Sequence, residues 1–187
     1  KLLPEEWQVL EQSVGRIVKA PIYIDETPGI TLTEFVAKSK RLVREKGVKI
    51  IFVDYLQLMH SGKPQLGGFS KVQEVTEISN TLKTTAKELN IPILALSQLN
   101  RGVEGRDGLE GKRPQLSDLR ESGAIEQDAD MVLFIHRPEY YHLYTDEKGR
   151  DLRGMAEIII AKHRNGSVGD VRLRFKGKFA RFENPED

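Results

Sequence analysis

The sequence contains no cysteine and no long apolar run. Without cysteine, the chain can form neither a disulfide framework nor a thiolate zinc site, which fits a reducing compartment. No apolar stretch approaches the roughly 18 residues of a membrane-spanning helix. Acids and Pro4 interrupt the opening residues KLLPEEWQVLEQ, so we expect no signal peptide. The chain starts with Lys1 rather than Met, and we expect it to be part of a longer protein.

The sequence also lacks a charge excess of either sign. Its 29 Lys and Arg residues against 28 Asp and Glu residues give a net charge of +1, which by itself neither favours nor excludes a nucleic acid partner. The distribution is more informative, because residues 162–181 are strongly basic and residues 101–120 are rich in arginine. A length of 187 residues with 39% hydrophobic and 30% charged residues indicates one globular domain of ordinary composition.

Helical and strand-like periods alternate along the chain. We expect amphipathic helices over about residues 3–17, 31–46 and 70–89, of which the last two open with capping boxes, and a short helix from about Ala124. We expect strands at residues 21–26, 50–55, 91–99 and 131–137, then a hairpin around RNGSVG within residues 155–175 and a short strand at residues 178–182. Polar, glycine-rich loops are expected at residues 60–69 and 100–115.

These elements predict an α/β fold. Apolar strands separated by amphipathic helices indicate a mostly parallel sheet that is covered on both faces, with the hairpin appended at its C-terminal end. Ligands of such sheets bind beyond the carboxyl ends of the strands. The polar residues expected at these ends are Asp54, Ser97, Gln98, His136 and Arg137.

Asp54 closes the apolar stretch IIFVD, a pattern typical of the acid that holds Mg²⁺ beside a nucleoside triphosphate. The alternative is a strand-end Asp that caps the following turn. Gln98 ends the stretch ILALSQ, where its amide could contact a γ-phosphate oxygen or orient water. The alternative there is a solvated loop residue.

Two further groups carry positive charge. Lys162 and Arg164 stand two residues apart in KHRNG, so they share one face of the predicted hairpin and could reach a neighbouring subunit's phosphate site in trans. Alternatively, they protect a sheet edge from aggregation. In DLRESGAIEQ, Arg120 and the helix expected after Gly123 could bind a nucleic acid backbone, although an internal Arg–Glu pair is the alternative.

Other motifs are missing. The P-loop pattern G-x-x-x-x-G-K-[ST], which cradles the triphosphate, does not occur; GLEGKR and SGKPQ both fail to match it. The four histidines show no common metal-ligand spacing, and we expect them to be structural or solvated.

Considered together, four ordered stretches resemble the C-terminal motor domain of bacterial replicative DNA helicases of the DnaB type. They are IIFVDYLQLM, EVTEISNTLKTTAKELNIPILALSQLNRGVEGR, KRPQLSDLRESGAIEQDADMVLFIHRPEYY and EIIIAKHRNGSVGDVRLRF. The resemblance covers nearly the whole chain from about Ile22 and, more loosely, the first helix. It implies a RecA-like three-layer sandwich, an ATP-driven ring of six subunits in the bacterial cytoplasm, and movement along single-stranded DNA. Primase and helicase loader are partners that the family implies.

The resemblance also implies roles for particular residues. Asp54 would hold Mg²⁺, and Gln98 would link the γ-phosphate of ATP to the DNA-facing loops. Lys162 and Arg164 would act in trans on the neighbour's ATP. The DNA-facing loop would contain Arg120, Glu121 and Gly123, which the resemblance assigns to contact with the DNA backbone.

The resemblance has departures as well. The family's P-loop, its water-activating glutamate and its collar domain would lie upstream of Lys1, so residues 1–187 would form a partial RecA-like domain without the P-loop half. We therefore expect this piece alone neither to hydrolyse ATP nor to unwind DNA. Alternatives are a related RecA-fold ATPase, such as a recombinase or an organellar helicase, and a nucleic-acid-binding module without ATP turnover. A small-molecule enzyme is disfavoured because the sequence shows no nucleophile–base pair.

Overall fold

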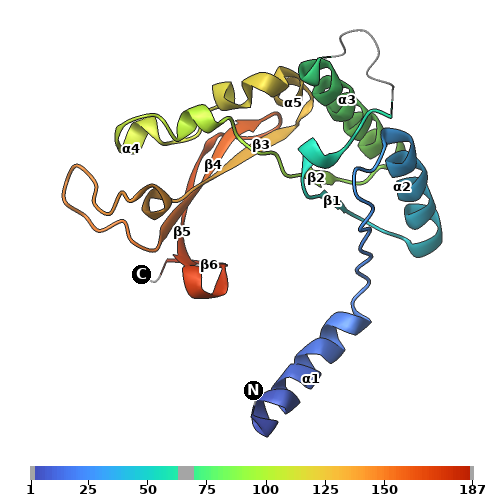
Figure 1. Ribbon diagram of the computed structural model, residues 1–187, viewed down its shortest axis with the longest axis horizontal. Coiled ribbons are helices and arrows are strands. Elements are labelled where there is room, and N and C mark those ends of the chain that lie inside the picture. Colours follow the sequence, from blue (N-terminus) through green and yellow to red (C-terminus); the bar gives the residue numbers. More distant parts are fainter. Residues whose placement is uncertain (1–2, 63–69, 186–187) are drawn as a thin grey trace.

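The computed structural model describes residues 3–62 and 70–185, and these form an α/β structure (Figure 1). The helices are α1 (Pro4–Lys19), α2 (Leu32–Lys46), α3 (Lys71–Leu89), α4 (Gly108–Gly111) and α5 (Gly123–Asp128). The strands are β1 (Ile51–Val53), β2 (Ile93–Ala95), β3 (Met131–His136), β4 (Met155–His163), β5 (Gly169–Lys176) and β6 (Arg181–Glu183). Most of the predicted loop 60–69 lies outside the described residues. No helix in the described part is long and apolar enough to cross a bilayer.

The strands form two sheets instead of the expected single, mostly parallel one. Strands β1 and β2 pair in parallel, with Phe52 opposite Leu94. Strands β3 to β6 form an antiparallel sheet in sequence order. The prediction of a mostly parallel sheet was therefore wrong for the described residues. The physical reason is the connectivity, because no α-helical crossover separates β3 from the predicted hairpin β4–β5, and consecutive strands without such a crossover pair antiparallel.

The strands are also not covered on both faces. Along β3, exposed and buried residues alternate strictly, and the exposed ones are Met131, Leu133 and Ile135. In the parallel pair, Phe52 and Leu94 are exposed as well. An apolar run predicts two covered faces, but within the described residues each sheet has a covering layer on one face only.

The main core lies between α2, α3 and the parallel pair. Its buried members include Leu32 and Phe35 from α2, Val53 from β1, and Ile78 and Leu82 from α3. These are the apolar positions that the helical spacing predicts. A second, smaller core joins Leu119, Val132 and Phe134 beneath the antiparallel sheet. Each sheet is thus held by its own cluster of buried side chains.

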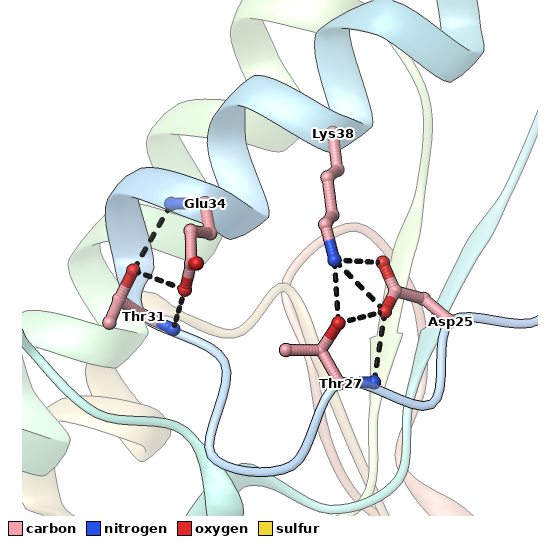
Figure 2. A network of polar contacts seen from close by, with 5 residues as sticks. All are labelled: Asp25, Thr27, Thr31, Glu34 and Lys38. Carbon is pink, nitrogen blue, oxygen red and sulfur yellow. Dashed lines mark hydrogen bonds and ion pairs between the residues drawn. The ribbon is translucent and has the colours of Figure 1, made fainter.

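Helix α2 begins as predicted, with a capping box. The Glu34 amide donates to Thr31 Oγ1 at 3.3 Å, and the Thr31 amide donates to Glu34 Oε2 at 3.1 Å (Figure 2). Beside this box, Lys38 Nζ lies 2.7 Å from Asp25 Oδ2 and 2.6 Å from Thr27 Oγ1. The hydrogen bond from Lys38 is the main cause that lowers the pKa of Asp25 to about 2. These contacts attach the segment before α2 to the helix.

That segment is not the strand predicted for residues 21–26. It has no regular secondary structure and pairs with no strand of the described chain, and Ile22 and Ile24 are exposed. Helix α1 has its predicted apolar stripe, including Trp7 and Ile17, yet this stripe is exposed because α1 projects away from the sheets (Figure 1). Alternating or periodic apolar residues predict the local conformation, whereas a paired strand or a buried stripe also needs a neighbour.

Candidate functional site

Asp54 and Gln98 lie at the same edge of the parallel pair. Because β1 and β2 run in parallel, the residues that follow them emerge together at their carboxyl ends. Main-chain bonds continue beyond the strands, from the Leu96 amide to the Val53 carbonyl and from the Leu56 amide to the Leu96 carbonyl, each at 2.9 Å. Both Asp54 and Gln98 are exposed at this edge. The predicted placement of these two residues is confirmed, while their roles stay predictions.

Gln57 connects the two strand ends, and the sequence analysis missed it. Its Nε2 donates to Ser97 Oγ at 3.0 Å, and its Oε1 accepts from the Gln98 amide at 3.3 Å. The only signal in the sequence is its place three residues after Asp54 in DYLQLM, which does not predict a partner 41 residues away. Gln57 therefore holds the Gln98 main chain beside the end of β1.

The segment after β2 continues into the region that was expected to contact DNA. The Asn100 amide donates to the Asp118 carbonyl at 3.2 Å. The Asp118 side chain is buried, forms an ion pair with Arg106 and accepts the Gln115 amide at 2.7 Å. A small pocket of about 80 Å³ lies here, and its lining includes Gln57, Gln98 and Leu119. Gln98 is thus linked through neighbouring contacts to the turn that precedes Arg120.

The loop predicted to face DNA is a turn that leads into α5. Arg120 and Glu121 lie in a 3₁₀ segment, Leu116–Ser122, and their side chains are outside the described part. Gly123 opens α5, which confirms the predicted short helix. A Cβ added at Gly123 would meet no atom within 4 Å among the residues described, so packing inside this chain does not require glycine there. The assignment of Arg120, Glu121 and Gly123 to DNA contact stays a prediction.

Lys162, at the end of β4, and Arg164, just beyond it, project to the same side as their spacing predicts, but their side chains contact their own domain. Lys162 Nζ lies 2.5 Å from the Glu126 carbonyl and 3.2 Å from the Gln127 carbonyl. Arg164 Nη2 donates to the same Gln127 carbonyl at 3.2 Å. The Arg164 side chain is still 49% exposed, so it can also make contacts outside the chain. Their predicted action on the ATP of a neighbouring subunit requires a second subunit, and it stays a prediction.

Among the residues predicted to bind the nucleotide, Asp54 is the carboxylate that could hold Mg²⁺. No group of three or more His, Asp or Glu side chains in residues 3–62 and 70–185 is arranged to hold a metal ion. Mg²⁺ in nucleotide sites commonly uses one or two carboxylates together with phosphate oxygens and water. An exposed carboxylate at the edge of the sheet fits this manner of binding, and a dedicated protein cage is not required.

His136, at the end of β3, is instead a core residue. Its side chain is 1% exposed, it stacks on Tyr141 with ring centroids 6.0 Å apart, and neither ring nitrogen has a hydrogen-bond partner within the described residues. Burial, and secondarily the positive charge of Arg113, lowers the pKa of His136 from 6.5 to about 4. This is consistent with the expected structural role, and it places His136 apart from the Asp54 edge.

Comparisons with known proteins identify the family of the chain. Residues 1–184 match the family model described as the DnaB-like helicase C-terminal domain. The chain is 48% identical over 186 residues to the replicative DNA helicase DnaC of Bacillus subtilis (strain 168), covering 99% of this chain and 38% of that protein. It is 47% identical over 187 residues to the replicative DNA helicase DnaB of Geobacillus stearothermophilus, covering 100% of this chain and 39% of the relative. The chain therefore spans less than two-fifths of the length of these relatives.

Solved structures are similar over the entire chain. One of them, described as an ATPase domain, has a TM-score of 0.85 at 38% identity, and the match covers 100% of this chain and 62% of that one. A DnaB-like replicative helicase, described with its interactions with primase, has a TM-score of 0.84 at 38% identity. The match covers 100% of this chain and 42% of that one. The resemblance inferred from the four sequence stretches is thereby confirmed: the chain belongs to the family of DnaB-like helicase C-terminal domains.

Proposed function

We propose that this chain is the C-terminal part of a hexameric, ATP-dependent replicative DNA helicase that translocates on single-stranded DNA in the bacterial cytoplasm. The observation that carries the proposal is the common edge of Asp54 and Gln98. Through Gln57 and Asn100, this edge is connected to the turn before Arg120. A nucleotide-binding edge and a DNA-binding loop joined in this way are what a motor needs to couple ATP turnover to movement.

The proposal gives each group a part in the chemistry. Mg²⁺ would neutralise developing charge on the phosphates, and the Asp54 carboxylate would hold the ion through oxygen contacts. The Gln98 amide would contact the terminal phosphate or orient the attacking water. Lys162 and Arg164 of one subunit would face the terminal phosphate of ATP held by the next subunit, because ring interfaces are head-to-tail. The N–H groups of arginine suit phosphate oxygens, and its charge persists at any working pH.

For DNA, we propose contact between phosphates and the loop of Arg120, Glu121 and Gly123. Such binding gives little sequence preference and a strong salt dependence. A partnership with primase is proposed because a similar helicase is described with its interactions with primase. A helicase loader is proposed from the family alone.

The finer fold assignment is also a proposal. We infer a RecA-like three-layer sandwich in which further residues of the complete protein cover the exposed strands. The support is the apolar character of the uncovered positions, including Phe52, Leu94 and Leu133. Residues 1–187 would then be a partial domain, completed by the part of the protein that contains the P-loop.

Mixed rings of two inactive subunits test the shared site. In the complete protein, Asp54→Asn should disable the nucleotide held by its own subunit, whereas Arg164→Ala should disable that of the neighbour. Each variant alone should lack DNA-stimulated ATP turnover. Mixed together, they should regain turnover, because some interfaces combine an intact Asp54 with an intact Arg164.

The matched control mixes Asp54→Asn subunits with subunits that carry both substitutions, since no interface then contains both intact groups. Turnover in this control mixture, or none in the complementary mixture while wild-type rings are active, would contradict the shared site. Wild-type rings without DNA-stimulated turnover would reject the motor itself.

A second candidate is a nucleic-acid-binding module without ATP turnover. The specific observation in its favour is that these 187 residues contain no phosphate-cradling loop. The two candidates differ in the complete protein, where only the motor requires a P-loop upstream of Lys1 and hydrolysis that depends on it.

A further inference from the structure

The last turn of α5 and the residues just after it contact two cationic side chains, Lys162 at the end of β4 and Arg164 just beyond it. The carbonyl groups at the end of a helix lack helical partners and carry partial negative charge. Here the carbonyls of Glu126 and Gln127 accept hydrogen bonds from Lys162, and that of Gln127 also accepts one from Arg164. The cations are therefore held by the main chain of a helix that begins at the DNA-facing loop.

Asp130 adds a side chain to this arrangement. Its Oδ1 lies 3.1 Å from Arg164 Nη1, and its Oδ2 lies 2.5 Å from Lys83 Nζ on α3. Its main-chain carbonyl also accepts the Arg164 amide at 2.8 Å. The hydrogen bond from Lys83 is the leading cause that keeps the pKa of Asp130 below its ordinary value, with Arg164 contributing, so the carboxylate stays charged. Asp130 thus links Arg164 to α3.

These contacts leave the outer part of the guanidinium available. Arg164 uses one Nη1 contact and one Nη2 contact within its own chain, out of the five N–H donors that a guanidinium carries. Its side chain is half-exposed, and the remaining donors suffice for a forked contact with phosphate oxygens. A long side chain held at two points also loses less conformational freedom when it binds a ligand.

We propose that Asp130 is a positioning residue that, together with the terminal carbonyls of α5, holds the Arg164 guanidinium ready for the phosphate of the neighbouring subunit. This inference rests on the proposed function of Arg164 and extends it to a group to which neither the sequence analysis nor the comparisons give a role. Asp130 touches neither phosphate nor metal, and it acts through Arg164.

The same contacts connect the proposed DNA-binding loop to Lys162 and Arg164. Helix α5 has six residues, a length of about 9 Å, and it starts directly after Arg120, Glu121 and Ser122. A displacement of the loop by a DNA phosphate would move the carbonyls that hold Lys162 and Arg164. We therefore expect the Asp130 contact to matter most when DNA is bound.

The test uses the complete protein with Asp130→Asn, which keeps the size of the side chain and removes its charge. We expect the DNA-stimulated kcat to fall about tenfold, as for one lost hydrogen bond between charged groups, with KM for ATP nearly unchanged. In an Arg164→Lys background, Asp130→Asn should have much less effect, since the guanidinium that it positions is already absent. Asp130→Glu, which retains the charge, should restore part of the lost rate.

Asp128→Asn is the matched control. Asp128 lies two residues away, at the end of α5, but its carboxylate accepts from Ser79 Oγ at 2.7 Å and has no contact with Lys162 or Arg164 among those the structure describes. Its variant should retain the wild-type kcat. Melting temperatures should be similar for wild type and Asp130→Asn, because the Asp130 side chain is exposed in its pairs with both Arg164 and Lys83, and surface ion pairs contribute little to stability.

Three results would overturn the inference while wild-type rings remain active. They are an unchanged kcat for Asp130→Asn, an equal proportional loss in the Arg164→Lys background, and the same loss for Asp128→Asn. If Asp130→Asn failed to fold, Asp130→Glu with a wild-type melting temperature and no change in kcat would overturn it as well. A wild-type ring without turnover would instead reject the proposed function, so the two failures are distinct.

Discussion

The parallel pair β1–β2 and the antiparallel sheet β3–β6 position their candidate site residues in different ways. In the parallel pair, the strand direction alone brings Asp54 and Gln98 to one edge, and Gln57 keeps the two ends together. In the antiparallel sheet, Arg164 lies just beyond the end of β4, and its side chain is oriented by groups from α5 and the segment before β3. The first arrangement follows from strand order, whereas the second depends on contacts across the fold. In the proposed function, the parallel pair would serve the subunit's own nucleotide, and Arg164 would be presented to a neighbouring subunit.

Arg164→Ala is the strongest test of this comparison. In the complete protein, whose hexameric ring is part of the proposed function, we expect ATP turnover to fall by roughly 10³-fold or more, the range known for arginine fingers that act in trans. Folding should be unaffected, because the side chain is half-exposed. Steady-state turnover together with circular dichroism measures both effects. The matched control is Arg153→Ala. It removes an exposed arginine that is paired with Asp151 and that precedes β4, at the opposite end of the strand from Arg164. Wild-type turnover in Arg164→Ala would end the assignment.

His136 tests whether the antiparallel sheet has an acid-sensitive core. Its pKa lies near 4 in the fold and 6.5 when exposed, so the unfolded chain binds the proton more tightly between these values. Stability from this residue is complete above about pH 6.5 and is lost as the pH falls toward 4, by about 3 kcal/mol in total. His136→Phe should remove this loss, as measured by denaturant unfolding at pH 7 and pH 5. His142→Asn, which changes an exposed histidine, should leave it in place.

A retained pH dependence in His136→Phe would show that another group is responsible. A variant that is less stable than wild type at both pH values by the same amount would indicate lost packing against Tyr141 instead of relief from protonation.

Arg120→Ala tests the loop that is proposed to bind DNA, which belongs to neither sheet. We expect binding to single-stranded DNA to weaken roughly tenfold, as for one lost contact between charged groups, and by the same factor for unrelated sequences. The slope of log K against log salt concentration should become shallower by about 0.7. Fluorescence anisotropy over a salt series measures both quantities. A loss confined to particular sequences would contradict backbone recognition.

Ser70→Ala is expected to have the smallest effect, and it concerns only the helix that covers the parallel pair. Ser70 Oγ accepts the Gln73 amide at 3.3 Å and caps α3. Its loss should lower the free energy of unfolding by about 1 kcal/mol. Thr76→Ala is the control within the same helix, where the hydroxyl only bonds back to the Val72 carbonyl. An equal loss in both variants would mean that capping is not the cause.

Local features were predictable because they depend on neighbouring residues. The capping boxes at Thr31 and Ser70 are present, and the αL stop at Gly47 ends α2 where expected. The hairpin around RNGSVG formed as predicted, since its turn and its alternating strands lie together in the sequence. The strand predicted for residues 21–26 did not form, because a strand also needs a partner and none is present in the described part.

The candidate site also contains residues that the sequence predicted and residues that it could not predict. The positions of Asp54 and Gln98 followed from the ends of two apolar strands, and the shared side of Lys162 and Arg164 followed from their spacing. Gln57 and Asp130 could not be found in this way. Their partners lie 41 and 34 residues away, with no pattern that pairs them.

By itself, the sequence determined the family, the main helices and the apolar strands, because ordered motifs and residue periods are local properties. Only the tertiary structure decided that the strands divide into a parallel pair and an antiparallel sheet, and that Asp130 and the end of α5 hold Arg164. The physical reason is that hydrogen bonds and ion pairs between distant segments depend on which surfaces meet in the fold. The identity of a single residue such as Asp130 or Gln57 does not predict which distant residue it will contact.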